Sequence, residues 1–364
     1  MKEEREGRVS LKQLVVLTFC GLLSPLTRVI PSQTGGLAGA GGWLGPLIAL
    51  PAFLLALWLM DGSMRRLPRG AGLGGLYRIG FGPVAGRAAS LVTFLWLLVT
   101  AAVSLRFCAE GFVSSIYSGT GIWMFLLALI AVVWWVSARG AAAVCRMGQV
   151  FFYILCITVG VVLVFALPGV RLYHIWPVWL EGWDSVLLSA LPVLSILGYS
   201  VPVLFYRGTL GESRGGFAMA AAWFTALCVV ISLMGLVIIG TFGWQMAVRF
   251  QLPFFSLAKE VTLLSIVERL ESVVTALWVF SDIALLGAFL LAATEQAQAI
   301  TSSFGRRGVI IMGCVLIVLL AAFLGSSTLQ LHAIWKKWMV LSDSIVCYLL
   351  PLAGCLAVRL RRRV

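Results

Sequence analysis

The chain alternates between long apolar runs and short polar segments, and this pattern limits the folds open to it. We count ten runs, most of them close to the roughly 20 residues that a helix needs to cross a bilayer. Because 61% of the residues are hydrophobic and only 11% are charged, lipid solvates most of the chain. The pattern predicts an all-α integral membrane protein with spans at 11–31, 43–60, 88–117, 121–137, 147–167, 185–206, 216–243, 269–294, 309–325 and 338–358.

The first run is expected to stay in the mature protein, because no small-residue cleavage site follows it. Ten spans divide into two sets of five. We therefore expect one transmembrane domain over 1–364, with a first repeat over 11–167 and a second, inverted repeat over 185–358.

The basic residues indicate which loops face the cytoplasm. A net charge of +13 could suggest nucleic acid, but the Lys and Arg residues fall in short clusters between apolar runs, so no nucleic-acid partner is expected. Most of the 27 lie in the N-terminal segment, the even-numbered loops and the tail. The positive-inside rule then predicts that both termini are cytoplasmic.

Proline and small residues interrupt two of the runs near mid-membrane, in the segments 23–28 and 192–202. These are the first and sixth spans, where a transporter built from inverted five-helix repeats has broken helices. A helix breaks inside lipid only when its freed N–H and C=O groups meet a polar partner. The alternative is that the prolines only kink packed helices, which membrane helices tolerate.

The residues at these interruptions suggest a ligand site. Ser24 before Pro25 is the pairing expected where a half-helix begins, and its free N–H groups would favour an anionic group. In the sixth span, Gly198 allows the backbone to turn, while Ser195, Tyr199 and Ser200 supply hydroxyls.

Charges inside the spans are a further signal, since a charge at bilayer depth usually faces a cavity or a partner. Arg106 and Glu110 stand four residues apart on the third span and can pair with each other. Asp282 lies midway along the eighth span, one turn beyond Trp278, with no local cation. It is a candidate for an amine contact or a proton-linked carboxylate, or for helix packing. Arg28 is expected to snorkel from the first span toward the outer surface.

Two outer segments stand apart from the spans. The aromatic stretch 171–179 suits the headgroup layer and predicts a membrane-surface anchor. The stretch 244–268 is too polar to span the bilayer, and it is expected either to lie along the interface or to fold back as a lid over an outward-facing vestibule.

Enzyme chemistry is not expected. The eight cysteines are scattered singly through apolar runs and the two histidines are far apart, so we expect no metal or cofactor. No phosphate-binding loop or nucleophile elbow is present.

The order of several short motifs resembles the spore-germination permease family, the GerAB-type B subunits of germinant receptors. These motifs are the aromatic-proline segment 250–260, Arg269-Leu270-Glu271 followed by Trp278, Arg139-Gly140 with Arg146, and Ile175-Trp176-Pro177 with Gly182.

The resemblance implies a LeuT-like, ten-helix member of the amino acid/polyamine/organocation superfamily in the spore inner membrane. Such a subunit is expected to bind a nutrient, often an amino acid, beside a membrane-anchored A subunit and a lipoprotein C subunit. The implied ligand contacts, at the broken spans and the third and eighth spans beside them, are Ser24, Pro25, Thr27, Trp96, Ser195, Gly198, Tyr199, Thr275, Trp278 and Asp282.

This chain departs from the family wording at two positions. It has Ala142 and Tyr199 where relatives often carry acidic residues, and the change at Tyr199 raises interest in Asp282 and Glu110 as substitutes. The leading hypothesis is a nutrient receptor that signals through partner subunits. The alternatives are a secondary transporter of amino acids or amines, and a scaffold or channel subunit that passes water or ions.

Overall fold

The structure is a computed structural model that describes residues 9–115, 121–260, 270–301, 305–324 and 338–361. All the regular secondary structure in these ranges is helical. Eight segments are long and apolar enough to cross a membrane. The first of them, Leu11–Met64, holds two helices, and the shorter apolar helix Ile122–Ala138 adds another. The described helices therefore confirm the predicted set of ten spans.

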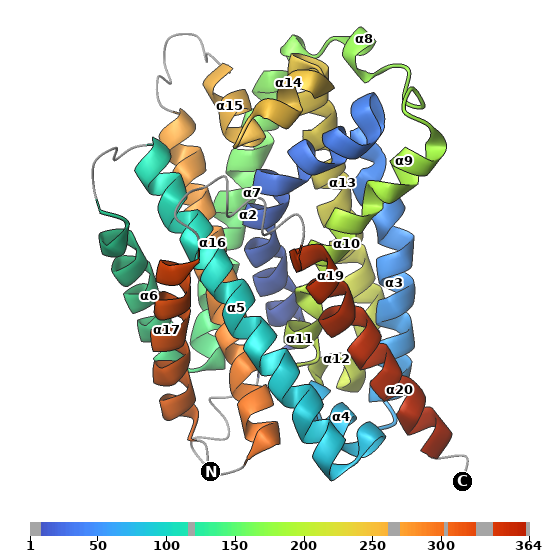
Figure 1. The fold of residues 1–364 in the computed structure, drawn as a ribbon, viewed down its shortest axis with the longest axis vertical. Coiled ribbons are helices and arrows are strands. Elements are labelled where there is room, and N and C mark those ends of the chain that lie inside the picture. The colour runs from blue at the N-terminus through green and yellow to red at the C-terminus, as the bar shows by residue number, and fades with distance from the viewer. Residues whose placement is uncertain (1–8, 116–120, 261–269, 302–304, 325–337, 362–364) are drawn as a thin grey trace.

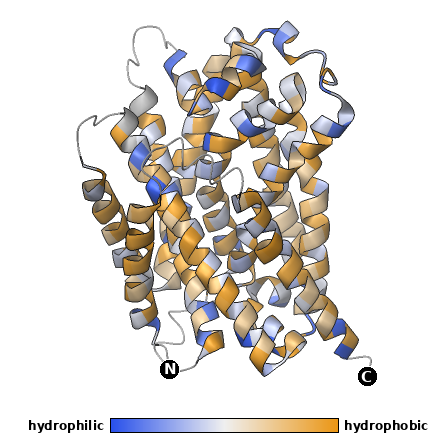
Figure 2. Ribbon diagram, viewed as in Figure 1, coloured by the Kyte–Doolittle hydropathy of each residue, from blue (hydrophilic) through white to orange (hydrophobic). Residues whose placement is uncertain are grey.

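The helices of the ten spans overlap the predicted ranges, with ends that differ by up to seven residues. They are α2 (Leu11–Ala38), α3 (Gly45–Met64), α5 (Pro83–Ser115), α6 (Ile122–Ala138), α7 (Ala141–Ala166), the sixth-span pieces described below, α13 (Gly216–Phe242), α16 (Leu270–Ile300), α17 (Arg306–Phe323) and the tenth span. Hydrophilic residues gather toward the two ends of the bundle, while hydrophobic residues dominate its length (Figure 2).

Helix α2 runs through the middle of the bundle and packs against α16, α7 and α13 (Figure 1). It begins at a capping box, in which the Ser10 hydroxyl accepts the N–H of Gln13 and the Gln13 side chain accepts the N–H of Ser10. Its backbone stays helical across Pro25 and Pro31. The short 3-10 helix η1 (Gly39–Leu44) then turns the chain into α3.

The sixth span is made of short pieces, α9 (Trp183–Leu188), α10 (Ala190–Gly198) and α11 (Ser200–Leu204). Below them the backbone of Arg207 takes the left-handed conformation, with φ of 49°. The tenth span is irregular as well. It consists of α19 (Val340–Asp343), the π-helix η5 (Ser344–Leu349) and α20 (Leu350–Arg361). Pi-helical turns are rare and are frequently found at functional sites.

Short helices close the two ends of the bundle. At one end lie α8 (Leu172–Ile175), α14 (Trp244–Arg249) and α15 (Pro253–Glu260), and at the other lie α4 (Leu73–Phe81) and α12 (Thr209–Glu212) (Figure 1). The start of α2 and the end of α20 lie at the same end, as an even number of spans requires. Of the predicted lid 244–268, residues 261–268 lie outside the described ranges.

Candidate ligand site

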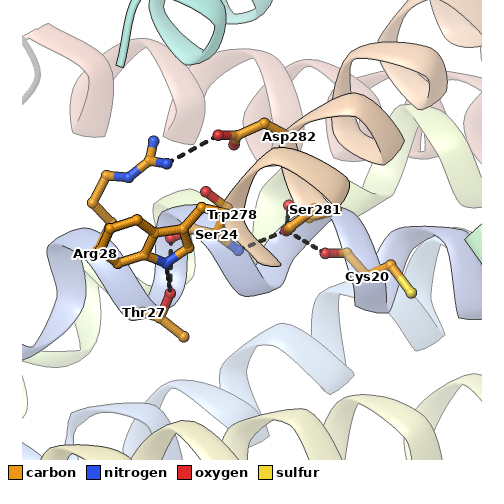
Figure 3. A network of polar contacts seen from close by, with 8 residues as sticks. Cys20, Ser24, Thr27, Arg28, Trp278, Ser281 and Asp282 are labelled. Carbon is orange, nitrogen blue, oxygen red and sulfur yellow. Dashed lines mark hydrogen bonds and ion pairs between the residues drawn. The ribbon is translucent and has the colours of Figure 1, made fainter. Parts of the chain in front are cut away.

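A side chain from α16 enters the hydrogen-bond ladder of α2 at its proline. The Ser281 hydroxyl accepts the N–H of Ser24 at 2.8 Å and lies 2.5 Å from the carbonyl oxygen of Cys20 and 3.3 Å from that of Gly21 (Figure 3). In an ordinary α-helix, the Ser24 N–H pairs with Cys20, and residue 25 donates to Gly21. Pro25 has no N–H to give. Ser281 therefore meets polar groups that the interruption frees.

Gly21 is the reason that α16 comes close enough for this contact. A Cβ atom at Gly21 would lie 3.0 Å from the Cα of Leu285, one turn beyond Ser281 on α16. A small residue at such a contact lets two membrane helices approach at the backbone. At the predicted interruption, α2 is thus a continuous helix, and a side chain of the neighbouring helix α16 completes its backbone hydrogen bonds.

A buried ion pair joins the same two helices one turn farther along. Arg28 Nη2 lies 2.9 Å from Asp282 Oδ2, and both side chains are almost fully buried, at 4% and 2% exposure. The indole N–H of Trp278 donates to the Thr27 hydroxyl at 2.9 Å, and the Arg28 guanidinium lies 5.1 Å from the centre of the Trp278 ring. The cluster therefore combines an anion, a cation, a hydroxyl and an aromatic face.

The expectation that Arg28 snorkels to the surface is wrong. Its guanidinium points inward to Asp282 (Figure 3). A partner 254 positions away in sequence could not be seen from local spacing. Two charges that are removed from water are stabilised only when they pair. If one partner is removed, the other charge stays buried alone, and the protein loses roughly 3–5 kcal/mol of stability.

A second buried carboxylate, Asp343, lies on the tenth span just before η5 and was not foreseen. It is fully buried. The Trp96 indole N–H donates to its Oδ1 at 2.9 Å, the Ser195 hydroxyl donates to its Oδ2, and Tyr199 also interacts with it. Among the described residues, no Lys or Arg forms an ion pair with this carboxylate.

An aromatic group connects Asp343 to α16. The rings of Trp96, Tyr199 and Phe289 lie 5.6 to 6.2 Å apart, in edge-to-face arrangements. Phe289 stands seven residues after Asp282, which places both on the same face of α16, two turns apart. The Arg28–Asp282 cluster and the Asp343 cluster thus lie along one side of one helix.

The other expected ligand contacts have different surroundings. Thr275 and Pro25 are buried on α16 and α2. Gly198 lies within α10, where a Cβ atom would come within 2.8 Å of the Cys347 Cβ and 3.0 Å of the Tyr348 ring. The glycine therefore permits close packing of the sixth span on the tenth, and its backbone is helical rather than turned.

Arg106 and Glu110 pair with each other as predicted, with 2.8 Å between Nε and Oε1. Arg106 Nη1 also donates to the carbonyl oxygen of Ala321 at 3.2 Å, near the end of α17. Both side chains are buried. The pair therefore ties α5 to α17.

Helix α15, at the end of the bundle opposite the described termini (Figure 1), lies beside the Arg28–Asp282 cluster. The Phe255 ring centre is 6.1 Å from that of Trp278, and α15 packs on α16, α2 and α7. Phe254 and Leu257 on the same helix are buried. This part of 244–268 thus covers the site, and its opening as a lid stays a prediction.

Three residues of the site were missed in the sequence. Asp343 carried the signal already used for Asp282, a carboxylate within an apolar span. Ser281 and Phe289 carried none, because a serine or a phenylalanine is ordinary in a membrane helix. The described residues include no cluster of three or more His, Cys, Asp or Glu side chains that could hold a metal ion.

Comparison with known families decides what kind of protein this is. The family model described as spore germination protein matches residues 8–330. The chain belongs to the spore germination protein family. The matched residues include the Arg28–Asp282 cluster and the side chains that contact Asp343 from other spans. Asp343 itself lies beyond the end of the match at residue 330. Among curated protein sequences no relative matches the chain.

The fold of this spore germination protein is that of a known class of transporters. It is similar to a Na⁺-coupled sialic acid symporter solved in a substrate-bound, outward-open state, with a TM-score of 0.65 and 13% sequence identity. The likeness covers 97% of this chain and 90% of the symporter chain. The protein is therefore an integral membrane protein with a permease-like, LeuT-like core. Its family and fold are of the permease and transporter type.

Proposed function

We propose that this spore germination protein is the B subunit of a germinant receptor and binds a small amino acid between α2 and α16. The observation that carries the proposal is the buried Arg28–Asp282 pair, at 2.9 Å, beside Thr27 and Trp278. A guanidinium and a carboxylate side by side match the two charged groups of a zwitterion. Membrane spans rarely hold such charges without a functional reason.

Binding would exchange one ion pair for two. The ligand carboxylate takes the place of Asp282 on the Arg28 guanidinium, and the ligand ammonium takes the place of Arg28 on the Asp282 carboxylate. Each buried charge keeps an opposite charge throughout, so neither pays the cost of standing alone. A ligand with only one of the two groups would leave one protein charge unpaired.

The same exchange gives a means of signalling. The pair joins α2 to α16, and Ser281, one residue before Asp282, completes the ladder of α2. A ligand that separates Arg28 from Asp282 favours a different spacing of these two helices, and so shifts the population between two arrangements of the bundle. In the proposed receptor, the A and C subunits would respond to that shift.

The family and the charge pattern support a proposal for the location. We place the protein in the spore inner membrane, with both termini in the cytoplasm. The basic clusters of the N-terminal segment and even-numbered loops support this orientation.

A working transporter is the second candidate, because the fold is that of a symporter and Asp343 is a buried carboxylate on the tenth span without an ion-pair partner in the described residues. Carboxylates of this kind mark proton and cation pathways. A passive scaffold or channel subunit is the third candidate and needs no saturable site.

Paired binding and uptake of radiolabelled amino acids distinguish these candidates. The purified protein is reconstituted alone in proteoliposomes, with and without an imposed proton gradient. The receptor proposal expects saturable binding without accumulation. Accumulation that depends on the gradient would identify a transporter instead, and neither binding nor uptake would favour the scaffold.

A further inference from the structure

Helices α6 and α17 lie side by side at the edge of the bundle (Figure 1). A groove lies between their side chains. One part of the groove has a volume of about 370 Å³ and is lined only by apolar side chains and Cys314. Leu127, Ile311 and Val315 in its walls are each more than half exposed. Both helices carry mainly hydrophobic residues (Figure 2).

The groove continues toward the end of the bundle where the described termini lie. A second part, of about 350 Å³, shares Trp134 and Ile311 with the first and also contains Trp135, Arg139 and Arg307. The Arg139 guanidinium lies 3.6 Å from the centre of the Trp135 ring. An apolar channel thus ends at two exposed cations and two indole rings.

A third guanidinium lies beside this basic end. Arg306 Nη1 is 3.6 Å from the Cβ position of Gly140, in the turn after α6. Its Nε and Nη2 atoms are buried and have no hydrogen-bond partner among the described residues. Gly305 caps α17 without a side-chain hydrogen bond, and the first N–H groups of this helix, which have no partner within the helix itself, also lie at this end.

We propose that this groove binds an anionic phospholipid of the adjoining leaflet. The phosphate lies against Arg139, Arg306 and Arg307, and an acyl chain follows the apolar part between α6 and α17. The charge of the basic end selects an anionic headgroup, and the length of the apolar part selects a lipid over a free anion. Basic pockets between spans on the cytoplasmic side recognise lipid headgroups by this combination.

Native mass spectrometry of the whole protein released from nanodiscs tests the proposal. The nanodiscs contain equal parts of phosphatidylglycerol and phosphatidylcholine with identical acyl chains. The wild type should retain phosphatidylglycerol preferentially, and Arg139→Gln/Arg307→Gln should reduce the preference by roughly 25-fold, since each of the two cations near a membrane contributes roughly a factor of five. Ala131→Phe, which fills the apolar part from its exposed wall, should reduce retention of both lipids at this site.

The matched control is Arg66→Gln/Arg87→Gln, which removes the same charge from exposed positions on the same end of the bundle. It should keep the wild-type preference. A wild type without preference would overturn the proposal, and would suit a groove that seats another transmembrane helix. A preference that survives the Arg139/Arg307 change, or that the control loses equally, would overturn it as well.

Discussion

The Ser281 hydroxyl of α16 accepts the backbone N–H of Ser24 in α2, at 2.8 Å. The contact involves the backbone of Ser24, and the Ser24 hydroxyl itself is buried with no hydrogen-bond partner among the described residues. The interruption at Pro25 is therefore satisfied by a neighbouring helix and not by the serine that precedes the proline.

The bridge predicts that Ser281→Ala lowers stability, because buried backbone groups of α2 lose a partner at a cost of about 1–3 kcal/mol. The thermal midpoint of the solubilised protein measures this. Ser24→Ala is the matched control, since it keeps the N–H and removes a hydroxyl without a partner, and its midpoint should stay near that of the wild type. Equal midpoints for the two variants would mean that the bridge is not stabilising.

The Arg28–Asp282 pair predicts strong coupling between its two positions. Arg28→Gln and Asp282→Asn each leave one buried charge alone, which costs roughly 3–5 kcal/mol. The double variant leaves no charge, and its loss should be much smaller than the sum of the two. A double-mutant cycle on thermal or denaturant stability checks this, and additive losses would contradict the pairing.

The Asp343 cluster predicts a difference between two serines of the sixth span. Ser195→Ala removes a donor from a buried carboxylate and should cost about 1–3 kcal/mol. Among the described residues, the Ser200 hydroxyl donates to the Leu197 carbonyl, three residues earlier in the same span, so Ser200→Ala should cost little. Comparison of the two thermal midpoints tests the assignment, which fails if Ser200→Ala is the more harmful change.

Gly198 predicts a packing effect at the sixth and tenth spans. Gly198→Ala forces a Cβ atom to within 2.8 Å of the Cys347 Cβ, and overpacking of this kind costs about 1–3 kcal/mol. Gly160 of α7 has open space at its Cβ position, so Gly160→Ala should be neutral or slightly stabilising. If Gly198→Ala is also neutral in unfolding experiments, the close contact is not as the structure has it.

The spans could be predicted from the sequence because each one is set by a local property, the length of an apolar run. The predicted span 216–243 matches α13 (Gly216–Phe242) almost residue for residue, whereas α2 (Leu11–Ala38) continues well past the predicted end at residue 31. The interruption at Pro25 was also local, since proline removes a donor wherever it stands. The hydrogen bonds made at this interruption could not be predicted from local sequence, because Ser281 supplies the missing contact from more than 250 residues away.

The candidate site was predicted only in part for the same reason. Arg28 near the end of a run reads as a snorkelling side chain, and only the packing of α2 against α16 turns it toward Asp282. Asp343 was within reach of the argument used for Asp282. Gly198 was expected to let the backbone turn, but its backbone is helical and its small size allows the sixth span to pack closely on the tenth.

The most direct test of the account is equilibrium binding of radiolabelled amino acids to the purified protein in proteoliposomes, for the wild type, Arg28→Gln and Asp282→Asn. The control Arg66→Gln changes one charge outside the site. For an amino acid that binds, excess of the matching amine or the matching carboxylic acid should compete poorly, because each carries one charge of the two. If the ligand binds at the Arg28–Asp282 pair, the wild type and the control should show saturable binding, and both site variants should lose it. Binding unchanged in either site variant would contradict it.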